Sequence, residues 1–311
     1  MKGLSLRSIA RRLNKSPSTI CREVARNGGA GKYRAAQADE RALREARRPK
    51  PPALASRSKL LKVVATKLQE DWSPEQIAGW LAFKYPKTPE MRVSHETIYR
   101  SLYLQTRGLL HRQLLDRLRT KRRMRKGKRW STTGQQRGRI IDAVSIHDRP
   151  PEVAARQQPG HWEGDLITGR RNTHIATLVE RYSRYVLLVR VAGKDSASVV
   201  GALIRKVNSL PDGLFLSLTW DRGTELALHA QFTEQTGVPV YFCDPKSPWQ
   251  RGTNENTNGL LRQYFPPGVD LSAFSQHELD LVAVRLNRRP RKVLGFSSPR
   301  SRITGGVAPT G

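Results

Sequence analysis

Three acidic residues lie in surroundings that are unusual for surface carboxylates. Asp165 lies in a segment of strand character, Asp221 directly follows another, and Glu255 stands among three asparagines at the start of a predicted helix. Asparagine side chains compete for backbone hydrogen bonds and weaken a helix, so packing alone does not explain this cluster. Carboxylate oxygens suit Mg²⁺, and two such cations can stabilise the attacking and leaving oxygens of a phosphodiester. The three residues are therefore candidate metal ligands for phosphodiester chemistry.

Neighbouring acids leave part of this assignment open. His161 and Glu163 share a strand face with Asp165 because side chains alternate along a strand, so either could be a ligand or could support one. Glu225 follows Asp221 by four positions, and the same ambiguity holds there. Isolated acids are most often surface groups or helix caps. The flanking glycine and the asparagine cluster favour a metal site over that ordinary role.

The charge of the chain indicates a polyanionic partner. Its 56 Lys and Arg against 26 Asp and Glu give a formal net charge of +30 and a pI near 11.1. Residues 1–150 contain 36 basic and 12 acidic side chains, and residues 151–311 contain 20 and 14. Nucleic acid is the expected ligand, held mainly by the first half of the chain. Ribosomal and histone-like proteins are equally basic, so charge alone specifies no reaction.

Cysteine content and hydropathy narrow the class of protein. Cys21 and Cys243 are far apart and belong to no C-x-x-C pair, which supports neither a disulfide framework nor a zinc finger. No apolar run is long enough to span a bilayer. We expect a cytoplasmic protein with two or three domains, in contact with no membrane.

The first residues have the pattern of a helix-turn-helix. Apolar residues recur at helical spacing over residues 6–13, a turn follows, and Pro17 begins a second helix that extends to about Arg26. The alternative is a small helical hairpin with solvated arginines, but the charge balance favours DNA. When such a helix enters a major groove, its side chains can reach phosphates and base edges. The candidates for DNA contact on this helix are Ser18, Thr19, Arg22 and Arg26.

A second helical module repeats the design. Ser73 and Ser94 are the predicted N-caps of two helices that flank a proline-containing turn. Gln76 follows Ser73 three residues later, and Val93, just before Ser94, faces Ile98. Such caps also occur in helical folds that bind no DNA, and that alternative stays open. As a second helix-turn-helix, the module would direct three side chains to DNA, namely His95, Thr97 and Arg100.

The second half of the chain alternates strands with helices. Strands are predicted at residues 161–168, 173–179, 185–191, 214–219 and 238–242, with helices at 196–210 and 227–236. Three early strands followed by alternating helices and strands indicate a mixed five-stranded α/β sheet with helices on its faces. That order is typical of a ribonuclease H-like core.

The predicted protein is multidomain, with all-α helix-turn-helix modules ahead of the α/β ribonuclease H-like catalytic domain. A run of like charges at Lys121–Arg129 would track phosphates within a linker. The predicted boundaries are a first module at 1–48, a proline-rich linker at 49–58, a second module at 59–104, a basic linker at 105–150 and the catalytic domain at 151–311.

Nearly the whole chain closely resembles the DDE transposases of the bacterial insertion-sequence-thirty family. The most specific segments are Gly160–Asp165, Trp220–Glu225, Ser247–Gly259 and Leu286–Gly295. The resemblance implies that Asp165, Asp221 and Glu255 form the catalytic triad and that Mg²⁺, or Mn²⁺ in its place, is the working metal. It further implies binding to double-stranded DNA at terminal inverted repeats and target sites, as a homo-oligomer in a bacterial nucleoid.

Two departures from the family and two alternative functions accompany this resemblance. The first helix begins almost at Met1, so the first module is expected to be truncated, and Ser298–Ser301 stands where the family commonly has Thr-Pro and an acid. One alternative is a repressor-like or architectural DNA-binding protein that has lost catalysis. The other is a retroviral-type integrase, although no zinc-binding His/Cys module precedes the core.

Overall fold

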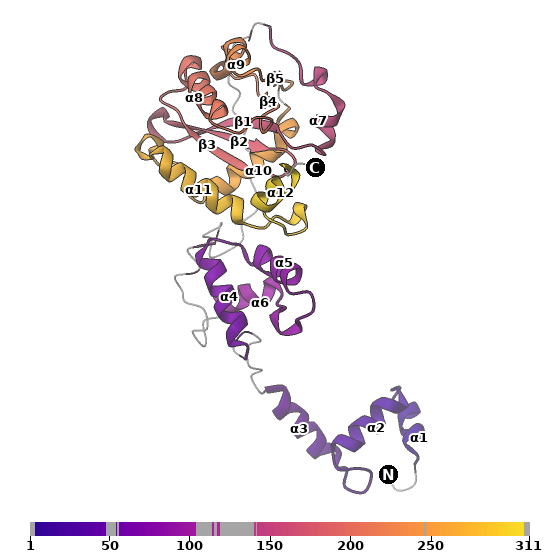
Figure 1. Cartoon of the computed structure of the whole chain (residues 1–311). Helices are drawn as coiled ribbons and strands as arrows, with labels where there is room; N and C mark the ends of the chain where they lie inside the picture. The colour runs from indigo at the N-terminus through magenta and orange to yellow at the C-terminus, as the bar shows by residue number, and fades with distance from the viewer. Residues whose placement is uncertain are drawn as a thin grey trace. The chain divides into compact units, whose positions relative to one another are not determined.

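The chain folds into two compact units, residues 1–52 and residues 53–311 (Figure 1). The structure is a computed structural model that describes residues 4–47, 54, 56–103, 114, 117, 118, 140, 142–245 and 247–307. Most of the predicted basic linker, including Lys121–Arg129, lies outside the described residues. In the described part, no helix combines the length and apolar character needed to cross a membrane.

The first unit contains three helices, and the first two are those of the predicted helix-turn-helix. The three are α1 (Leu6–Arg12), α2 (Pro17–Arg26) and α3 (Ala35–Arg47). Asn14 adopts a left-handed φ of 50° in the turn between α1 and α2, and the Ser16 side chain caps α2 by accepting a hydrogen bond from the Thr19 amide. The predicted helix-turn-helix geometry is therefore built by local caps and a short turn.

The second helical module consists of α4 (Ser58–Gln69), α5 (Pro74–Lys84) and α6 (His95–Tyr103), with a 3₁₀ turn between α5 and α6. The predicted capping box at Ser73 is present: its side chain accepts from the Gln76 amide while the Gln76 side chain accepts from the Ser73 amide. Both orphan donors at the start of α5 are thereby satisfied.

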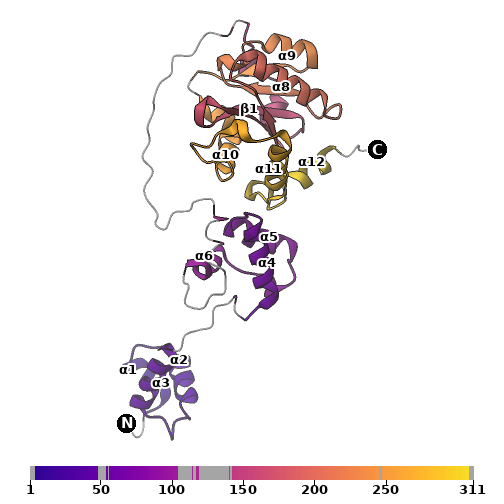
Figure 2. The same ribbon diagram turned by 90° about the vertical axis from the view of Figure 1, so that its left-hand side faces the viewer.

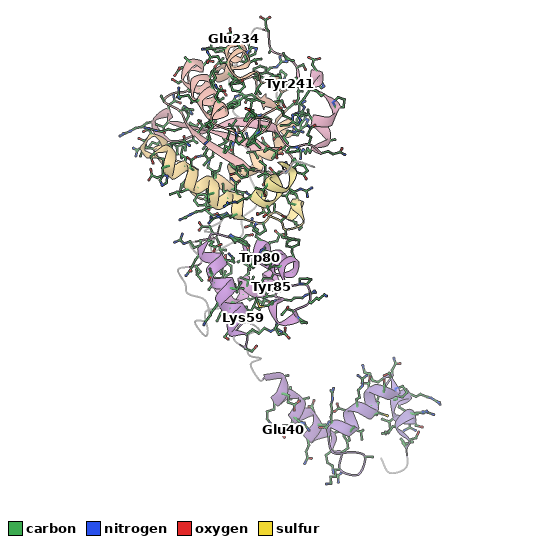
Figure 3. The ribbon with its side chains drawn as sticks, in the orientation of Figure 1. Glu40, Lys59, Trp80, Tyr85, Glu234 and Tyr241 are labelled. Carbon is green, nitrogen blue, oxygen red and sulfur yellow. The ribbon has the colours of Figure 1, made fainter. Side chains whose placement is uncertain are left out.

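An apolar core holds the second module together. Trp80 meets Trp72 and Tyr85 edge-on, with ring centroids 5.5 and 6.0 Å away; Trp80 and Tyr85 are labelled in Figure 3. The fully buried aliphatic residues of the three helices are Leu60, Val64, Leu68, Ile77, Leu81, Ile98 and Leu102. This module thus has its own hydrophobic core, of the size that fixes a small helical domain.

The rest of the second unit is built on the predicted mixed sheet, whose strand order is β3-β2-β1-β4-β5. β2 pairs antiparallel with β1 and β3, and β4 runs parallel to both β1 and β5. The strands are β1 (His161–Thr168), β2 (His174–Glu180), β3 (Val186–Arg190), β4 (Ser217–Trp220) and β5 (Val240–Phe242). This is the architecture of a ribonuclease H-like fold.

Helices cover both faces of the sheet, as Figure 2 shows. One apolar cluster joins α8 and α9 to the sheet, and another joins α10 and α11 to its other face. The helices of this part are α7 (Pro151–Ala155), α8 (Ser196–Asn208), α9 (His229–Thr236), α10 (Gly252–Leu261), α11 (Gln276–Arg288) and α12 (Pro299–Val307).

The predicted strand at 214–219 was placed three residues too early, since β4 begins at Ser217. A turn with Gly213 at a φ of 76° comes just before it, and the Leu214 carbonyl accepts a hydrogen bond from the Trp162 indole. Residues 214–216 therefore belong to the loop that packs against β1, although their apolar character resembles that of a strand.

The alternation of side chains along β1 decides where its acids lie. Trp162 belongs to the core under α8 and α9, and a Cβ at Gly164 would lie 2.1 Å from the Trp220 ring on the same face. Glu163 and Asp165 consequently project to the other face, which is covered by α10. Both acids contact residues of that helix.

The second helical module is attached to the sheet-containing domain through two acidic residues, Asp71 and Glu75, of which Glu75 pairs with Lys292 over 2.9 Å. Asp71, at a left-handed φ of 64° between α4 and α5, is 6% exposed and lies 3.8 Å from the guanidinium groups of Arg285 and Arg289. Close by, the ring of Phe296 covers Gly79, where a Cβ would lie 2.1 Å from it. A partly buried group of ion pairs and a close-fitting ring therefore fix α5 against the C-terminal part of the domain.

Candidate active site

Asp165 and Asp221 lie together on the α10-covered face of the sheet, at the end of β4, with Arg251 between them. β1 carries Asp165, and Asp221 directly follows β4, which is the parallel neighbour of β1. Arg251 Nη1 lies 3.4 Å from Asp165 Oδ1, and Nη2 donates to Asp221 Oδ2 over 3.1 Å. Arg251 Nη1 also donates to the Gly164 carbonyl over 2.8 Å. One guanidinium therefore connects both aspartates to the backbone of β1.

Amide groups orient the two carboxylates. Asp165 Oδ2 accepts from the Asn258 side-chain amide over 3.0 Å, and Asp165 Oδ1 accepts from the Leu166 backbone amide over 2.9 Å. Asp221 Oδ1 accepts from the Gly223 backbone amide over 3.0 Å, two residues further along the chain. Each carboxylate thus has one oxygen facing Arg251 and the other held by an amide.

The carboxylate pair is only partly accessible to solvent. The side chains of Asp165, Asp221 and Arg251 are 24%, 15% and 10% exposed. Burial raises the pKa of Asp165; Arg251 opposes this rise and the Asp221 charge adds to it. Burial alone would lower the pKa of Arg251, but the two aspartates more than offset it and raise the pKa above its ordinary value. The site therefore places two negative charges in a partly buried setting, where a nearby cation offsets their repulsion.

Two of the three asparagines in the motif attach α10 to the sheet. The Asn254 side chain is fully buried, donates to the Glu163 carbonyl over 3.0 Å and lies 3.0 Å from the donating Thr177 hydroxyl on β2. Asn258, one turn later, contacts Asp165 and the same hydroxyl. These amides therefore hold β1 and β2, whereas the sequence had suggested that they surround Glu255.

The structure separates the neighbouring acids from the aspartate pair. Glu163 is fully buried, accepts from Arg181 over 3.0 Å and also accepts from the Asn254 backbone amide. Burial lowers the pKa of Arg181 to about 10, and Glu163 opposes that shift. Glu225 is buried beside the Trp220 indole, 3.4 Å from its nitrogen. Both acids occupy interior positions with partners of their own.

His161 is likewise engaged within the sheet. Its ring nitrogen Nδ1 lies 2.8 Å from the hydroxyl of Ser217 on β4, and the side chain is buried. The histidine therefore supports the pairing of β1 with β4, four residues before the first aspartate of the pair along the same strand face.

Glu255 lies on α10 next to this pair but does not join it. The residue is exposed, and among the described residues no side chain or amide forms a hydrogen bond or ion pair with it. Residues three or four apart are neighbours on a helix surface, so Glu255 lies between Arg251 and Asn258, both of which contact Asp165. The described residues accordingly contain no cluster of three metal-ligating side chains.

The donor chemistry of the pair fits a divalent cation. Asp165 Oδ1 and Asp221 Oδ2 are hard oxygen ligands that face a common positive group. Mg²⁺ and Mn²⁺ both favour such carboxylate ligands. Two of the three predicted ligands are therefore positioned for a metal, and the third lies on the adjacent helical turn.

The predicted DNA-contacting residues of the first module lie on one accessible helix. The four candidates on α2 are all exposed: Ser18, Thr19, Arg22 and Arg26. Arg22 Nε donates to the Ser18 carbonyl over 3.2 Å, and the hydroxyl groups of Ser18 and Thr19 lie 2.8 and 2.9 Å from that of Ser16. The helix therefore presents preorganised hydroxyl and guanidinium groups on its surface.

The candidates of the second module differ in accessibility. His95 and Arg100 are exposed on α6, whereas Thr97 is half-buried and its hydroxyl lies 2.8 Å from that of Ser94. Arg100 Nε is 3.5 Å from a carboxylate oxygen of Glu96. This helix therefore offers fewer free donors than α2.

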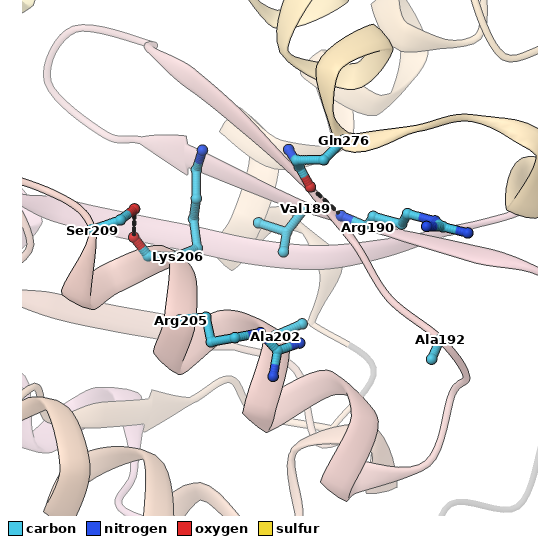
Figure 4. A pocket seen from close by; sticks show the side chains of 8 residues that line it. All are labelled: Val189, Arg190, Ala192, Ala202, Arg205, Lys206, Ser209 and Gln276. Atoms are coloured by element: carbon cyan, nitrogen blue, oxygen red, sulfur yellow. Dashed lines mark hydrogen bonds between the residues drawn. The ribbon is translucent and has the colours of Figure 1, made fainter.

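An open groove of about 570 Å³ lies away from the carboxylate pair, along the outer edge of β3 (Figure 4). Gln276 accepts from the Arg190 amide and donates to the Leu188 carbonyl, both over 2.8 Å, so it covers part of the free edge. None of the three candidate ligands lines this groove. The side chains that line the groove are explained by protection of the edge strand β3, and they need no catalytic role.

Sequence reasoning missed Arg251, although the residue stands inside the quoted motif. The available signal was spacing: Arg251, Asn254 and Asn258 recur at helical intervals and so share one face of α10. It also missed the pairing of Arg181 with Glu163, because nothing local connects these residues.

Two families match parts of the chain. The integrase core domain matches residues 155–248, a range that includes Asp165 and Asp221, and a helix-turn-helix domain matches residues 1–27.

Several curated proteins are similar over nearly the whole chain. Transposase InsI for insertion sequence element IS30A of Escherichia coli is 54% identical over 309 residues, which cover 99% of this chain and 80% of the relative. The transposase for insertion sequence element IS1086 of Cupriavidus metallidurans is 50% identical, with 95% and 88% covered. The transposase for insertion sequence element IS4351 of Bacteroides fragilis is 33% identical, with 96% and 90% covered.

Proposed function

Because the chain belongs to the insertion-sequence-thirty family of transposases, we propose that it cuts and joins DNA at the ends of an insertion element. Asp165, Asp221 and Glu255 are the proposed catalytic carboxylates. The observation that carries this proposal is that Asp165 and Asp221 lie together at the end of β4, beside the helical turn that bears Glu255. A repressor would need no such pair of carboxylates at its surface.

In the proposed reaction, Asp165 and Asp221 hold Mg²⁺ or Mn²⁺, and Glu255 completes the ligand set from α10. Divalent metal bound there would stabilise the attacking and leaving oxygens of a phosphodiester. Asn258 and the Gly223 amide keep the carboxylates oriented, and α10 is anchored through Asn254. A water and then a DNA 3′-hydroxyl are the proposed nucleophiles, so no covalent protein intermediate is required.

The helical modules supply DNA recognition in this proposal. The α2 candidates read the terminal inverted repeats, and the exposed residues of α6 assist or contact a neighbouring stretch of duplex. We further propose that the enzyme works as a homo-oligomer, since two element ends must be held together, and that it acts in the bacterial cytoplasm at the nucleoid. Target DNA would then enter at the carboxylate edge.

The direct test is cleavage of a labelled duplex that carries the inverted repeats found in the DNA flanking the gene. Asp165→Asn, Asp221→Asn and Glu255→Gln should each abolish cleavage and joining with Mg²⁺ or Mn²⁺, because each removes an anionic metal ligand. Binding of the same duplex, measured by gel shift without metal, should persist because the helical modules are unchanged.

The matched control is Glu234→Gln, a charge-neutralising change at an exposed acid of α9, labelled in Figure 3, which should retain activity. Glu163→Gln and Glu225→Gln are unsuitable controls because both residues are buried, and loss of Glu163 would leave Arg181 unpaired. Undiminished cleavage by Glu255→Gln would remove Glu255 from the site. A wild-type protein that binds the repeats but never cuts them would support the repressor alternative.

A further inference from the structure

Arg251 occupies the position in which the two aspartates require a positive charge. Its guanidinium faces Asp165 Oδ1 and Asp221 Oδ2 at 3.4 and 3.1 Å. The Asn258 and Gly223 amides hold the opposite oxygens, and the Leu166 amide also donates to Asp165 Oδ1. Arg251 is 8% exposed and is fixed by its bond to the Gly164 carbonyl. The oxygens that a metal would take are therefore the ones that this side chain contacts.

Electrostatics explains why a cation belongs there. Two carboxylates that are only 24% and 15% exposed repel one another, and each is poorly hydrated. A single guanidinium neutralises half of that charge and satisfies one oxygen of each group with the geometry that arginine suits. Divalent metal supplies more charge to the same oxygens, so the guanidinium and the metal compete for them.

We propose that Arg251 is an internal counter-cation that holds Asp165 and Asp221 in place without metal and releases them when divalent metal binds. The inference rests on the proposed function, because it assumes that these two aspartates are metal ligands. Arg251 is thus a positioning residue: it keeps the two aspartates in place and offsets their mutual repulsion until a metal ion binds. Arg251 is the N-cap residue of α10, directly before its first turn, and this position connects the exchange to the helix that carries Glu255.

Thermal unfolding of the full chain tests the first half of the proposal. Without metal, Arg251→Gln should lower the unfolding midpoint by about 3–6 °C, since it removes the guanidinium that contacts both half-buried carboxylates. Arg251→Lys should lose less because it keeps the charge. In the Asp165→Asn/Asp221→Asn background the same Arg251→Gln change should lower the midpoint by no more than about 1 °C. A full loss in that background would show that Arg251 merely ties α10 to the Gly164 carbonyl, and the proposal would fall.

The matched control is Arg262→Gln, which removes the guanidinium at the C-cap of α10. Arg262 donates to the Thr168 carbonyl of β1, and within the described part of the chain no aspartate forms an ion pair with it. Its effect on the midpoint should be the same with and without the two aspartates. The pair of variants separates a general loss of helix anchoring from a loss of charge compensation.

Metal binding tests the second half. Mn²⁺ binding, followed by the electron paramagnetic resonance signal of the free ion, should be about 5–10-fold tighter in Arg251→Gln than in wild type, because the competitor is gone. Adding Mg²⁺ should shift the side-chain Nε–H resonance of Arg251, assigned by its loss in Arg251→Lys, and should not shift it in Asp165→Asn/Asp221→Asn. Unchanged or weaker Mn²⁺ binding in Arg251→Gln, or a resonance that ignores saturating Mg²⁺, would overturn the exchange.

These readouts keep the two proposals apart. If wild-type protein binds Mn²⁺ with the predicted competition but never cuts inverted-repeat DNA, the proposed function fails and the counter-cation role stands. If wild-type protein cuts DNA while Arg251→Gln matches it in metal-free stability and Mn²⁺ affinity, the counter-cation role fails and the proposed function stands.

Discussion

The two helical modules look alike in sequence but differ in how they are held. Among residues 4–46 the buried apolar side chains are Ala10 and Ala38, and α2 buries none. The second module buries a continuous cluster of large residues over α4, α5 and α6 and is attached to the catalytic domain through Asp71. Short capped helices therefore differ in setting within one chain: α2 is the proposed surface for DNA, and α5 is a structural support.

The difference has a physical cause in what each module can bury. A helical pair with only alanines inside gains little from the hydrophobic effect, so its helices depend on caps and exposed ion pairs such as Arg41 with Glu45. The second module contains leucine, isoleucine, valine and tryptophan at its contacts. We infer that the first module opens locally far more often than the second, and that its helices gain stability when they bind DNA.

The largest expected effect comes from truncating a side chain in the core of the second module. Leu81→Ala should lower its free energy of unfolding by about 3–5 kcal/mol, since Leu81 is fully buried and truncation leaves a cavity. Ile20→Ala, a truncation of a half-buried residue of α2, should cost about 1 kcal/mol or less in the first module. Hydrogen exchange measured by mass spectrometry over residues 58–103 and 4–47 reports each module separately. Equal losses would erase the proposed difference between them.

The next effect concerns the attachment of the second module. Asp71→Asn should lower the stability of the second unit by about 2–3 kcal/mol, because Arg289, 2% exposed, loses its buried counter-charge. Asparagine tolerates the left-handed backbone at this position, so the change isolates the charge. Glu45→Gln, which breaks an exposed ion pair of α3, should change stability by less than about 0.5 kcal/mol. Denaturant unfolding measures both, and a neutral Asp71→Asn would show that the Asp71 charge does not hold the module, which would then depend on Phe296 packing and the Glu75–Lys292 pair.

The sequence predicted the modules and much of the sheet because the relevant signals are local. Helical spacing and Pro17 at the first helical position placed α1 and α2, and the alternation of side chains placed β1. The sequence did not predict the different anchoring of the modules, since Asp71 and Arg289 are more than two hundred positions apart and neither has a distinctive neighbour. Contacts between distant residues decide such roles.

The same limit applies to the candidate site. Glu163 and Asp165 lie on one strand face, and only burial against Arg181 separates them. The motif around Glu255 was visible, but its asparagines bind β1 and β2, and the cation between the aspartates is Arg251. The catalytic assignment of the three acids stays a prediction. In the structure two of them, Asp165 and Asp221, lie together around Arg251, and the third, Glu255, lies nearby on α10.

The smallest expected effect distinguishes the two helices, α2 and α6, that are proposed to contact DNA. Arg22 on α2 has no carboxylate partner among the described residues, whereas Arg100 on α6 lies beside Glu96. Arg22→Ala should weaken binding of inverted-repeat duplex by about 1 kcal/mol and lower the salt dependence by about one released counterion, if the residue contacts a phosphate. Arg100→Ala should have a smaller effect, because Glu96 already offsets its charge.

A paired variant sharpens this last comparison. Glu96→Gln should strengthen duplex binding if α6 approaches DNA, since it frees the Arg100 guanidinium, and Arg100→Ala in that background should cost more than it does in wild type. Arg44→Ala is the control, because Arg44 forms a similar exposed pair with Glu40 on α3, away from the proposed reading surface. Fluorescence anisotropy across a salt series gives both affinity and slope. If Glu96→Gln leaves both unchanged while Arg22→Ala reduces both, α2 reads DNA and α6 serves the fold alone; if neither variant matters, the division of labour between the modules is wrong.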